Sequence, residues 1–432
     1  MFNKKILIAF CFTLLLLLSA NASFAEIKTF VKEYTYQASE VDSKLSSRTV
    51  SLREVKRLLL EQLGTYLESI TEVKNFQLTK DQIVTLTAGI VSTEVMEDTW
   101  DGKVYWLKAK ILADPESVIK SIDRLRQDRQ KVKELEEVRR RSEQLLRENE
   151  RLRKELEVAK GEKKQEQAEA YSRNIIELSA IEWFQKGLAF KESNNHYEAI
   201  VSFSEAIKLD PKNPLFFIAR GLSYATIDNI PEAINNFDKA IKLEPKQALN
   251  SLNYFTRGFF YERLGNYKQA LHDYNTALKL DPKFAQAYKN RGRAYQLTGN
   301  NVKAINDFNK AISLGVINSD IYCKRGVSYF ASKNYKKALK DFLKAIELNP
   351  TFVRAYSRSG ACYRHMGNNK AALSMFNKAI ELDPQDASNY VGRGLAYETL
   401  GDRNDSIDDF KIAARLGNEE AQNLLREQGI EW

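Results

Sequence analysis

Residues 319–352 carry the pattern from which the fold can be predicted, and they read SDIYCKRGVSYFASKNYKKALKDFLKAIELNPTF. Gly326 has a tyrosine four positions before it, Ala338 lies 12 positions after it, and Phe342 lies four further on. Pro350 closes the stretch. Small glycine and alanine positions let two helices approach closely where aromatic side chains interlock. The stretch therefore predicts a tightly packed pair of helices.

The same spacing recurs along residues 180–417, at intervals of 34 residues with one interval of 37. The glycine of each copy is Gly187, Gly221, Gly258, Gly292, Gly326, Gly360 or Gly394. A fixed period of this length indicates stacked units, each of which buries its remaining face only against its neighbours. The pattern resembles that of tetratricopeptide repeats. The resemblance implies a mainly α fold, with an α-solenoid of seven repeats over residues 174–432 that ends in a capping helix.

The copies also act as an internal alignment, and they show a paired substitution. An arginine stands just before the glycine in every copy that has an aspartate just before the aromatic residue of its second helix. The copy with Ser359 in place of that arginine has Met375 in place of the aspartate. We therefore predict a structural Arg–Asp bridge between the two helices of a repeat, or across to the next repeat.

Residues 1–25 have the composition of a secretory signal peptide. Lys4 and Lys5 precede an apolar run of about 13 residues, and small residues end the segment at Ala25. A membrane-spanning helix needs about 20 apolar residues, so we expect cleavage after Ala25, with a retained anchor as the alternative. The mature protein would then be periplasmic. The whole sequence has 66 Lys and Arg against 57 Asp and Glu. In an exported protein this excess is not assigned to a nucleic-acid partner, and no stable membrane span is expected after cleavage.

Residues 26–114 predict a small α+β domain. A β-branched and aromatic segment comes first, and a segment with helical periodicity follows it. Two β-rich runs, Ile83–Met96 and Tyr105–Ile111, then flank Asp101 and Gly102, and an Asp-Gly pair between such runs is a strong hairpin signal. This β-α-β-β order resembles the N-terminal region of flagellar assembly protein T, a small domain of the bacterial envelope.

Residues 115–173 predict a coiled coil, because apolar residues recur there at heptad a and d positions. These residues are Leu135, Val138, Leu145, Leu152, Leu156 and Ala159. Asn149 stands at an a position between leucines, which favours a parallel pair of helices in one register. The segment thus predicts a homodimer joined through a rod. The alternative is a single solvated helix of paired charges.

The resemblance also implies a ligand groove, because the first helix of each tetratricopeptide repeat lines the concave wall. Groove positions are mostly apolar in the first three repeats and basic in the next three. The basic set is Lys289, Arg293, Lys324, Arg354, Arg358 and Arg364. It resembles the carboxylate clamp of chaperone-binding tetratricopeptide domains, except that Arg293 and Lys324 replace two asparagines.

The basic set predicts a site for a C-terminal carboxylate, an acidic peptide or an anionic polymer. The alternative is a generally basic surface on a basic protein. The apolar positions of the first repeats either take a partner peptide or are covered by the preceding helix around residues 175–178.

The sequence predicts no catalytic, cofactor or metal site. Three His and three Cys in 432 residues offer neither metal-ligand spacing nor a catalytic pairing. Each recurring glycine has a packing role, so none of them belongs to a phosphate-binding loop. These observations favour a non-enzymatic protein.

The sequence therefore favours an exported scaffold or adaptor that holds protein partners in its groove. Two alternatives stay open. A coiled coil followed by repeats is similar in layout to the periplasmic cell-division coordinator that links the Tol system to peptidoglycan synthesis. A binding protein for anionic glycan or lipid belongs to another class, and its binding would collapse with salt, whereas a groove anchored by apolar residues would keep its ligand.

Overall fold

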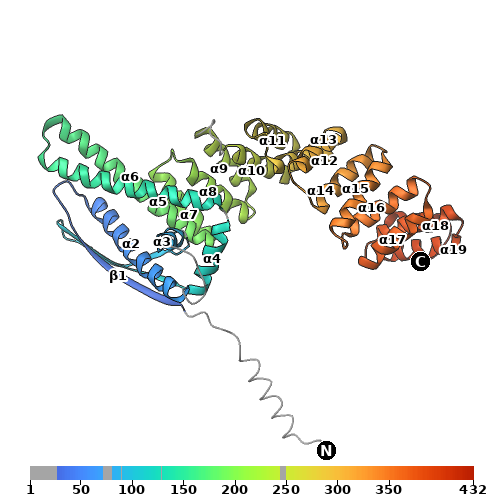
Figure 1. The fold of residues 1–432 in the computed structure, drawn as a ribbon, viewed down its shortest axis with the longest axis horizontal. Helices are drawn as coiled ribbons and strands as arrows, with labels where there is room; N and C mark the ends of the chain where they lie inside the picture. Colours follow the sequence, from blue (N-terminus) through green and yellow to red (C-terminus); the bar gives the residue numbers. More distant parts are fainter. Residues whose placement is uncertain (1–26, 72–79, 89, 128, 244–249) are drawn as a thin grey trace, which may run out of the picture. The chain divides into compact units, whose positions relative to one another are not determined.

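The fold is mainly α, as predicted: a helical solenoid follows a small N-terminal sheet (Figure 1). Contacts divide the chain into two compact units, the first of which ends at Leu243. Within the described ranges, no helix is both long and apolar enough to cross a bilayer. The predicted signal peptide lies outside these ranges. The computed structural model describes residues 27–71, 80–88, 90–127, 129–243 and 250–432.

The N-terminal sheet is antiparallel, with the strand order β1-β3-β2. Its strands are β1 (Lys28–Gln37), β2 (Thr93–Trp100) and β3 (Val104–Ala113). Helix α2 (Lys44–Thr71) packs on the face of the sheet where alternate residues of β3, from Tyr105 to Ala113, are buried. The short helix α3 (Lys80–Thr87) adds Leu86 to the same core. The α+β layer expected here is therefore present.

The turn between β2 and β3 confirms the predicted hairpin. Asp101 Oδ1 accepts hydrogen bonds from the backbone N–H of Lys103 at 2.8 Å and of Val104 at 2.7 Å. Gly102 has a φ of +95°, a left-handed conformation that glycine adopts without strain. The β-rich run expected from Ile83 is wrong in its first part, because Lys80–Thr87 is helical. A short apolar run does not by itself distinguish a buried helix from a strand.

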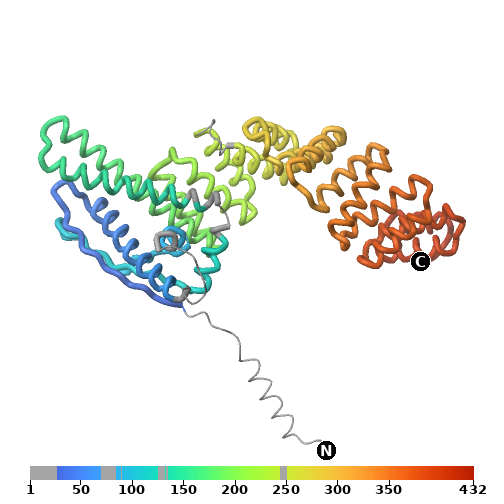
Figure 2. Tube along the Cα trace, in the orientation of Figure 1, coloured from blue at the N-terminus to red at the C-terminus, as the bar shows by residue number. Residues whose placement is uncertain are grey.

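The continuous rod predicted over residues 115–173 is wrong. The described part of this range holds α4 (Pro115–Gln127), α5 (Arg129–Val158) and the beginning of α6 (Gly161–Glu192). Lys160 is extended and Gly161 has a φ of +59°. The chain therefore turns back, and α5 and α6 pack side by side (Figure 2). The boundary predicted at residues 173–174 falls inside α6.

The heptad seam of α5 is filled by residues of the same chain. Leu145 packs on Leu178 of α6, and Leu152 packs on Tyr171 and Ile175. Helix α2 lies between the sheet and the α5–α6 pair (Figure 1). Because the seam is occupied within one chain, it no longer supports the predicted homodimer, which stays a prediction.

Helix pairs make up the rest of both units, and the first and second helix of a pair are named its A and B helix. In the first unit α6 pairs with α7 (His196–Leu209) and α8 (Pro214–Thr226) pairs with α9 (Ile230–Leu243). The second unit ends with α20 (Glu419–Glu427), which packs on α19 and buries Ala421 and Leu425. The pairs of the second unit are α10 (Asn250–Arg263) with α11 (Tyr267–Leu280), α12 (Ala285–Leu297) with α13 (Asn301–Ser313), α14 (Ser319–Ala331) with α15 (Tyr335–Leu348), α16 (Val353–His365) with α17 (Asn369–Leu382), and α18 (Ala387–Leu400) with α19 (Arg403–Arg415).

The A and B helices approach most closely at the recurring glycine. A Cβ atom on Gly326 would lie 2.7 Å from Phe342 Cε1, and one on Gly292 would lie 2.9 Å from Phe308 Cε1. Both separations are too short for carbon atoms, so only glycine lets the ring pack there. The predicted packing role of the recurring glycine is confirmed.

The predicted Arg–Asp bridge is also confirmed, and it lies within the repeat. Arg291 donates from Nε and Nη2 to the two carboxylate oxygens of Asp307, each at 2.7 Å. Its Nη1 donates to Asn275 of the preceding B helix, also at 2.7 Å. Each such arginine joins three helices. The full arrangement recurs at Arg325 with Asp341 and Asn309, and at Arg393 with Asp409 and Asn377.

Candidate peptide-binding groove

The A helices of the second unit form the wall that carries the predicted basic set. Helices α10, α12, α14, α16 and α18 lie in succession, and each contacts the next. Asn318 caps the start of α14 by accepting the N–H of Ile321 at 3.0 Å, which fixes the first turn of that helix. The basic set is distributed with Lys289 and Arg293 on α12, Lys324 on α14, and Arg354, Arg358 and Arg364 on α16.

The two lysines of the set converge on one carboxylate. Lys289 Nζ lies 3.3 Å from Asp320 Oδ2, and Lys324 forms an ion pair with Asp320 on its own helix. Burial by itself would raise the pKa of Asp320, but the hydrogen bond and charge of Lys324 and the charge of Lys289 lower it overall. Both lysines therefore have an acidic partner within the wall, and the three groups together keep one positive charge.

Arg293 is also neutralised within the wall. Its Nε donates to Glu262 Oε1 of α10 at 2.6 Å, and the side chain of Glu262 is 1% exposed. The hydroxyl of Tyr274 donates to the other oxygen of Glu262 at 2.6 Å. Burial and the Glu262 charge raise the pKa of Tyr274. Arg293 compensates a buried carboxylate and so has a structural partner.

The arginines of α16 behave differently. Arg354 and Arg358 are exposed, and neither forms an ion pair with any described residue. They stand four residues apart and so share one side of the helix. Arg364 is half-buried, and its Nε has no hydrogen-bond partner in the described chain. These three side chains are named the α16 arginines, and they are what remains of the predicted basic site.

The thiol of Cys323 on α14 shows which cations gather here. Burial raises its pKa to about 11, and the charges of Arg354, Lys324 and Arg358 act against that rise. Cys323 of α14 packs in one cluster with Ala355 and Cys362 of α16, so the two helices are in contact at this part of the wall.

The acidic partners are what the sequence argument missed. Glu262 and Asp320 lie on A helices at repeat positions that the internal alignment also assigns to the groove. At these positions the sequence shows an acidic residue on the same or a neighbouring A helix for three of the six cations, but the ion pairs themselves come from the structure.

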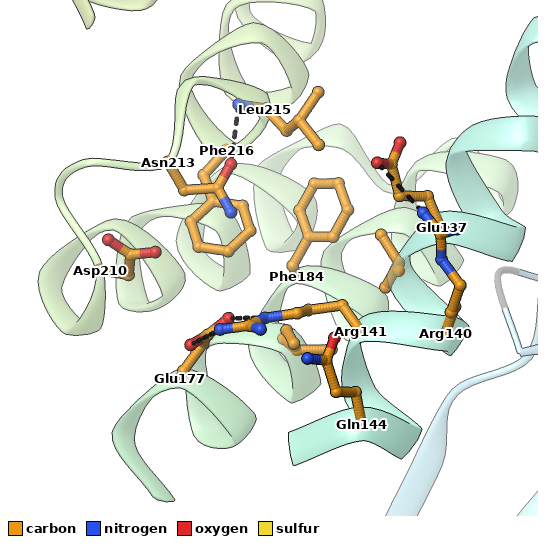
Figure 3. Close-up of a pocket in the computed structure, with 12 residues that line it drawn as sticks. Glu137, Arg140, Arg141, Gln144, Glu177, Phe184, Asp210, Asn213, Leu215 and Phe216 are labelled. Atoms are coloured by element: carbon orange, nitrogen blue, oxygen red, sulfur yellow. Dashed lines mark hydrogen bonds and ion pairs between the residues drawn. The ribbon is translucent and has the colours of Figure 1, made fainter. Parts of the chain in front are cut away.

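The A-helix wall of the first repeats is covered by the chain itself. Val138 of α5 packs on the cluster that contains Phe184 of α6 and Leu215 of α8. The expected cover was the helix around residues 175–178, but those residues belong to α6, so the cover is α5 instead. A pocket of about 410 Å³ remains between α5, α6 and the start of α8 (Figure 3).

Within the described residues, no group of three or more His, Cys, Asp or Glu side chains is placed to hold a metal ion. Cys323 and Cys362 are free and buried, and burial raises the pKa of Cys362 to about 12. A thiol with so high a pKa is not an activated nucleophile.

The helix pairs, the glycine–aromatic contacts and the continuous A-helix wall define a helical-repeat solenoid protein. Models of the tetratricopeptide repeat match residues 285–314, 319–352 and 353–386, and a model described as TPR repeat matches residues 187–228 and 260–299. The chain therefore carries tetratricopeptide repeats, as the resemblance implied. The number of seven repeats stays a prediction.

Several solved structures are similar to this chain. YrrB, described as a TPR protein with an unusual peptide-binding site, is 26% identical, with a TM-score of 0.40 over 44% of this chain and 97% of YrrB. A tetratricopeptide repeat protein from Parabacteroides merdae ATCC 43184 is 25% identical, with a TM-score of 0.43 over 57% of this chain and 98% of its own. MamA is 27% identical, with a TM-score of 0.36 over 38% of this chain and 96% of its own. No curated protein matches the chain.

Proposed function

We propose that this protein is a non-enzymatic scaffold of the cell envelope that binds a protein partner on the A-helix wall of its second unit. The observation that carries the proposal is the pair Arg354 and Arg358, which are exposed, share one side of α16 and lack an ion pair among the described residues. Two neighbouring guanidinium groups suit a carboxylate, because each presents a planar fork of donors. The partner segment is accordingly acidic or ends in a free C-terminal carboxylate.

The paired cations around this site narrow the ligand further. Lys289, Lys324 and Arg293 already compensate Asp320 and Glu262, so the wall as a whole is not a continuous cationic track. An anionic polymer binds most tightly where many free cations follow one another. A peptide that places one or two carboxylates at α16 fits this distribution of charge better than a glycan does.

The envelope location rests on the composition of residues 1–25. Export to the periplasm would exclude nucleic acid as a natural partner of the positive charge. Cell fractionation of the tagged chain checks this part of the proposal, because a cytoplasmic protein of unshortened mass would refute it.

A peptide titration tests the site. The probe is a fluorescein-labelled decapeptide that ends in four glutamates, used in its free-acid and amidated forms, with binding read as fluorescence anisotropy. We expect Arg354→Ala with Arg358→Ala to weaken binding about tenfold or more, because charge-assisted hydrogen bonds each contribute about 1.5–3 kcal/mol.

The control removes two other cations, Lys344→Ala with Lys378→Ala, which are half-buried, lie on B helices and pair with glutamates of their own helices. Equal weakening by both double variants would mean a nonspecific charge effect and would refute the site. If the amidated peptide binds more weakly than the free-acid peptide, the C-terminal carboxylate is the group that the site binds.

A further inference from the structure

The first unit has a candidate site of its own, whereas the α16 arginines belong to the second unit. We infer that the pocket between α5, α6 and the start of α8 binds a basic side chain, lysine or arginine, of a polypeptide partner. The pocket measures about 410 Å³, which falls in the range of sites that hold small ligands or side chains.

The floor of the pocket is apolar and aromatic. The rings of Phe184 and Phe216 lie 5.0 Å apart, and Val138, Ile181 and Leu215 continue the apolar surface. Figure 3 shows the Phe184 and Phe216 side chains in the middle of the lining, with Asp210 and Asn213 beside them. Such a floor suits a chain of methylene groups, and aromatic rings also attract a cation.

The charges around the floor leave one carboxylate unmatched. Arg141 donates from Nε to Glu177 Oε1 at 2.6 Å and from Nη2 to Glu177 Oε2 at 2.8 Å. Arg140 Nη2 lies 3.7 Å from Glu137 Oε1. The lining therefore has three carboxylates against two guanidinium groups. Asp210 has no cationic partner among the described residues, so the surplus negative charge belongs to it.

Asp210 has a local role that other aspartates share. Its Oδ1 accepts the backbone N–H of Lys212 at 3.0 Å at the end of α7. Asp281 accepts the N–H of Lys283 at 2.9 Å at the end of α11 in the same way. Asp281 does not line the pocket. The two residues therefore separate loop stability from ligand binding.

The pocket suits both the apolar stem and the charged head of a lysine or arginine side chain. The aliphatic stem covers Phe184, Phe216 and Leu215, and the charged head reaches the half-buried Asp210. A glutamate would meet Asp210 with like charge, and an uncharged stem would leave that carboxylate unpaired. The pocket thus selects for a positively charged ligand, whereas the α16 arginines select for a negatively charged one.

Peptide pools test the inference on the full chain. Four pools of nine-residue peptides have lysine, arginine, norleucine or glutamate fixed at the centre and an equal mixture of Ala, Ser, Leu and Gly elsewhere. We expect the lysine and arginine pools to bind at least about fivefold better than the norleucine pool. Asp210→Asn should weaken the binding of these two pools about fivefold or more, to the norleucine level, because the lost contact is charge-assisted. Asp281→Asn should leave binding unchanged.

The two proposed sites are distinguishable in the same experiment. When all pools are amidated at the C-terminus, Arg354→Ala with Arg358→Ala should weaken binding of the glutamate pool about tenfold or more and leave binding of the lysine pool unchanged. Lysine binding no better than norleucine binding, an equal effect of Asp210→Asn and Asp281→Asn, or no binding of any pool would each overturn the inference. Equal thermal midpoints of the two Asn variants show that the loop is intact.

Discussion

The two units bury aspartate in different ways. In the first unit Asp42 has no exposed side-chain surface and accepts hydrogen bonds from Tyr171 at 2.5 Å and from the backbone N–H of Ser39 at 2.8 Å, with Arg153 Nε at 3.3 Å. In the second unit Asp307 is held by one arginine, and the same contact recurs from repeat to repeat. The first arrangement joins segments more than 100 residues apart and occurs at one place. The second is local and periodic.

The two arrangements indicate where the stability of each unit is concentrated. Loss of one bridge in the second unit leaves the neighbouring bridges and repeats intact, since a solenoid sums local contacts. Loss of Asp42 affects β1, α2, α5 and α6 together, because donors on or beside all four elements converge on it.

The largest effect is expected for Asp42→Ala. The variant removes the acceptor of the Tyr171 hydroxyl and the carboxylate that pairs with Arg153, and breaking a buried ion pair costs about 3–5 kcal/mol. Urea unfolding followed by tryptophan fluorescence measures this loss, with Trp432→Phe as the background, because Trp100, Trp106 and Trp183 then report on the first unit. A loss below about 1 kcal/mol would show that Asp42 does not hold these elements together.

A smaller and confined effect is expected for Asp307→Ala. The Arg291 side chain is 18% exposed, so the lost contact is partly buried, and we expect a cost of about 2–4 kcal/mol. In a double-mutant cycle with Arg291→Ala the coupling energy should reach about 1–3 kcal/mol. Additive losses would contradict the bridge. Hydrogen exchange should localise the change to α12, α13 and their neighbours.

The same contrast explains what the sequence could predict. The Arg–Asp bridge was predictable because the repeats form an internal alignment in which Ser359 and Met375 change together. The glycine–aromatic packing was predictable for the same reason. The turn at Lys160 and Gly161 was not, since the heptad pattern of α5 is the same whether its seam meets a second chain or α6.

The candidate site was predictable only in part. The positions of the six cations on their A helices followed from the repeat, but their pairing depends on Glu262 and Asp320, which lie in neighbouring repeats. The pocket beside Asp210 could not be predicted, because it exists only where α5 packs on α6 and α8.

Acid should weaken the first unit through Asp42. Burial alone would raise the pKa of this carboxyl, but hydrogen bonds from Tyr171 and Ser39 and the charge of Arg153 lower it below the ordinary value. In the unfolded chain the carboxyl of Asp42 has a pKa near 4. Above that pH the ionised carboxylate makes its full contribution to the free energy of unfolding. This contribution is lost as the pH falls through the lower pKa that Asp42 has in the folded protein. The stability difference between the native chain and Asp42→Asn should be constant from about pH 5 to 7 and shrink below about pH 4. A difference that grows on acidification would reverse the sign of this argument.

The smallest effect tests the seam that the sequence assigned to a dimer. Neither amide atom of Asn149 has a hydrogen-bond partner among the described residues, although the residue is buried, with 4% of its surface exposed. Removing a buried, unsatisfied polar group removes its desolvation cost, so Asn149→Leu should stabilise the first unit by about 1 kcal/mol. Ser359→Ala is the matched variant in the second unit, where the hydroxyl is also buried without a partner, and its gain should be smaller because one hydroxyl is involved. If a second copy of the chain satisfied Asn149, the leucine variant would instead lower stability and change the mass measured by light scattering, and the intramolecular account of α5 would be wrong.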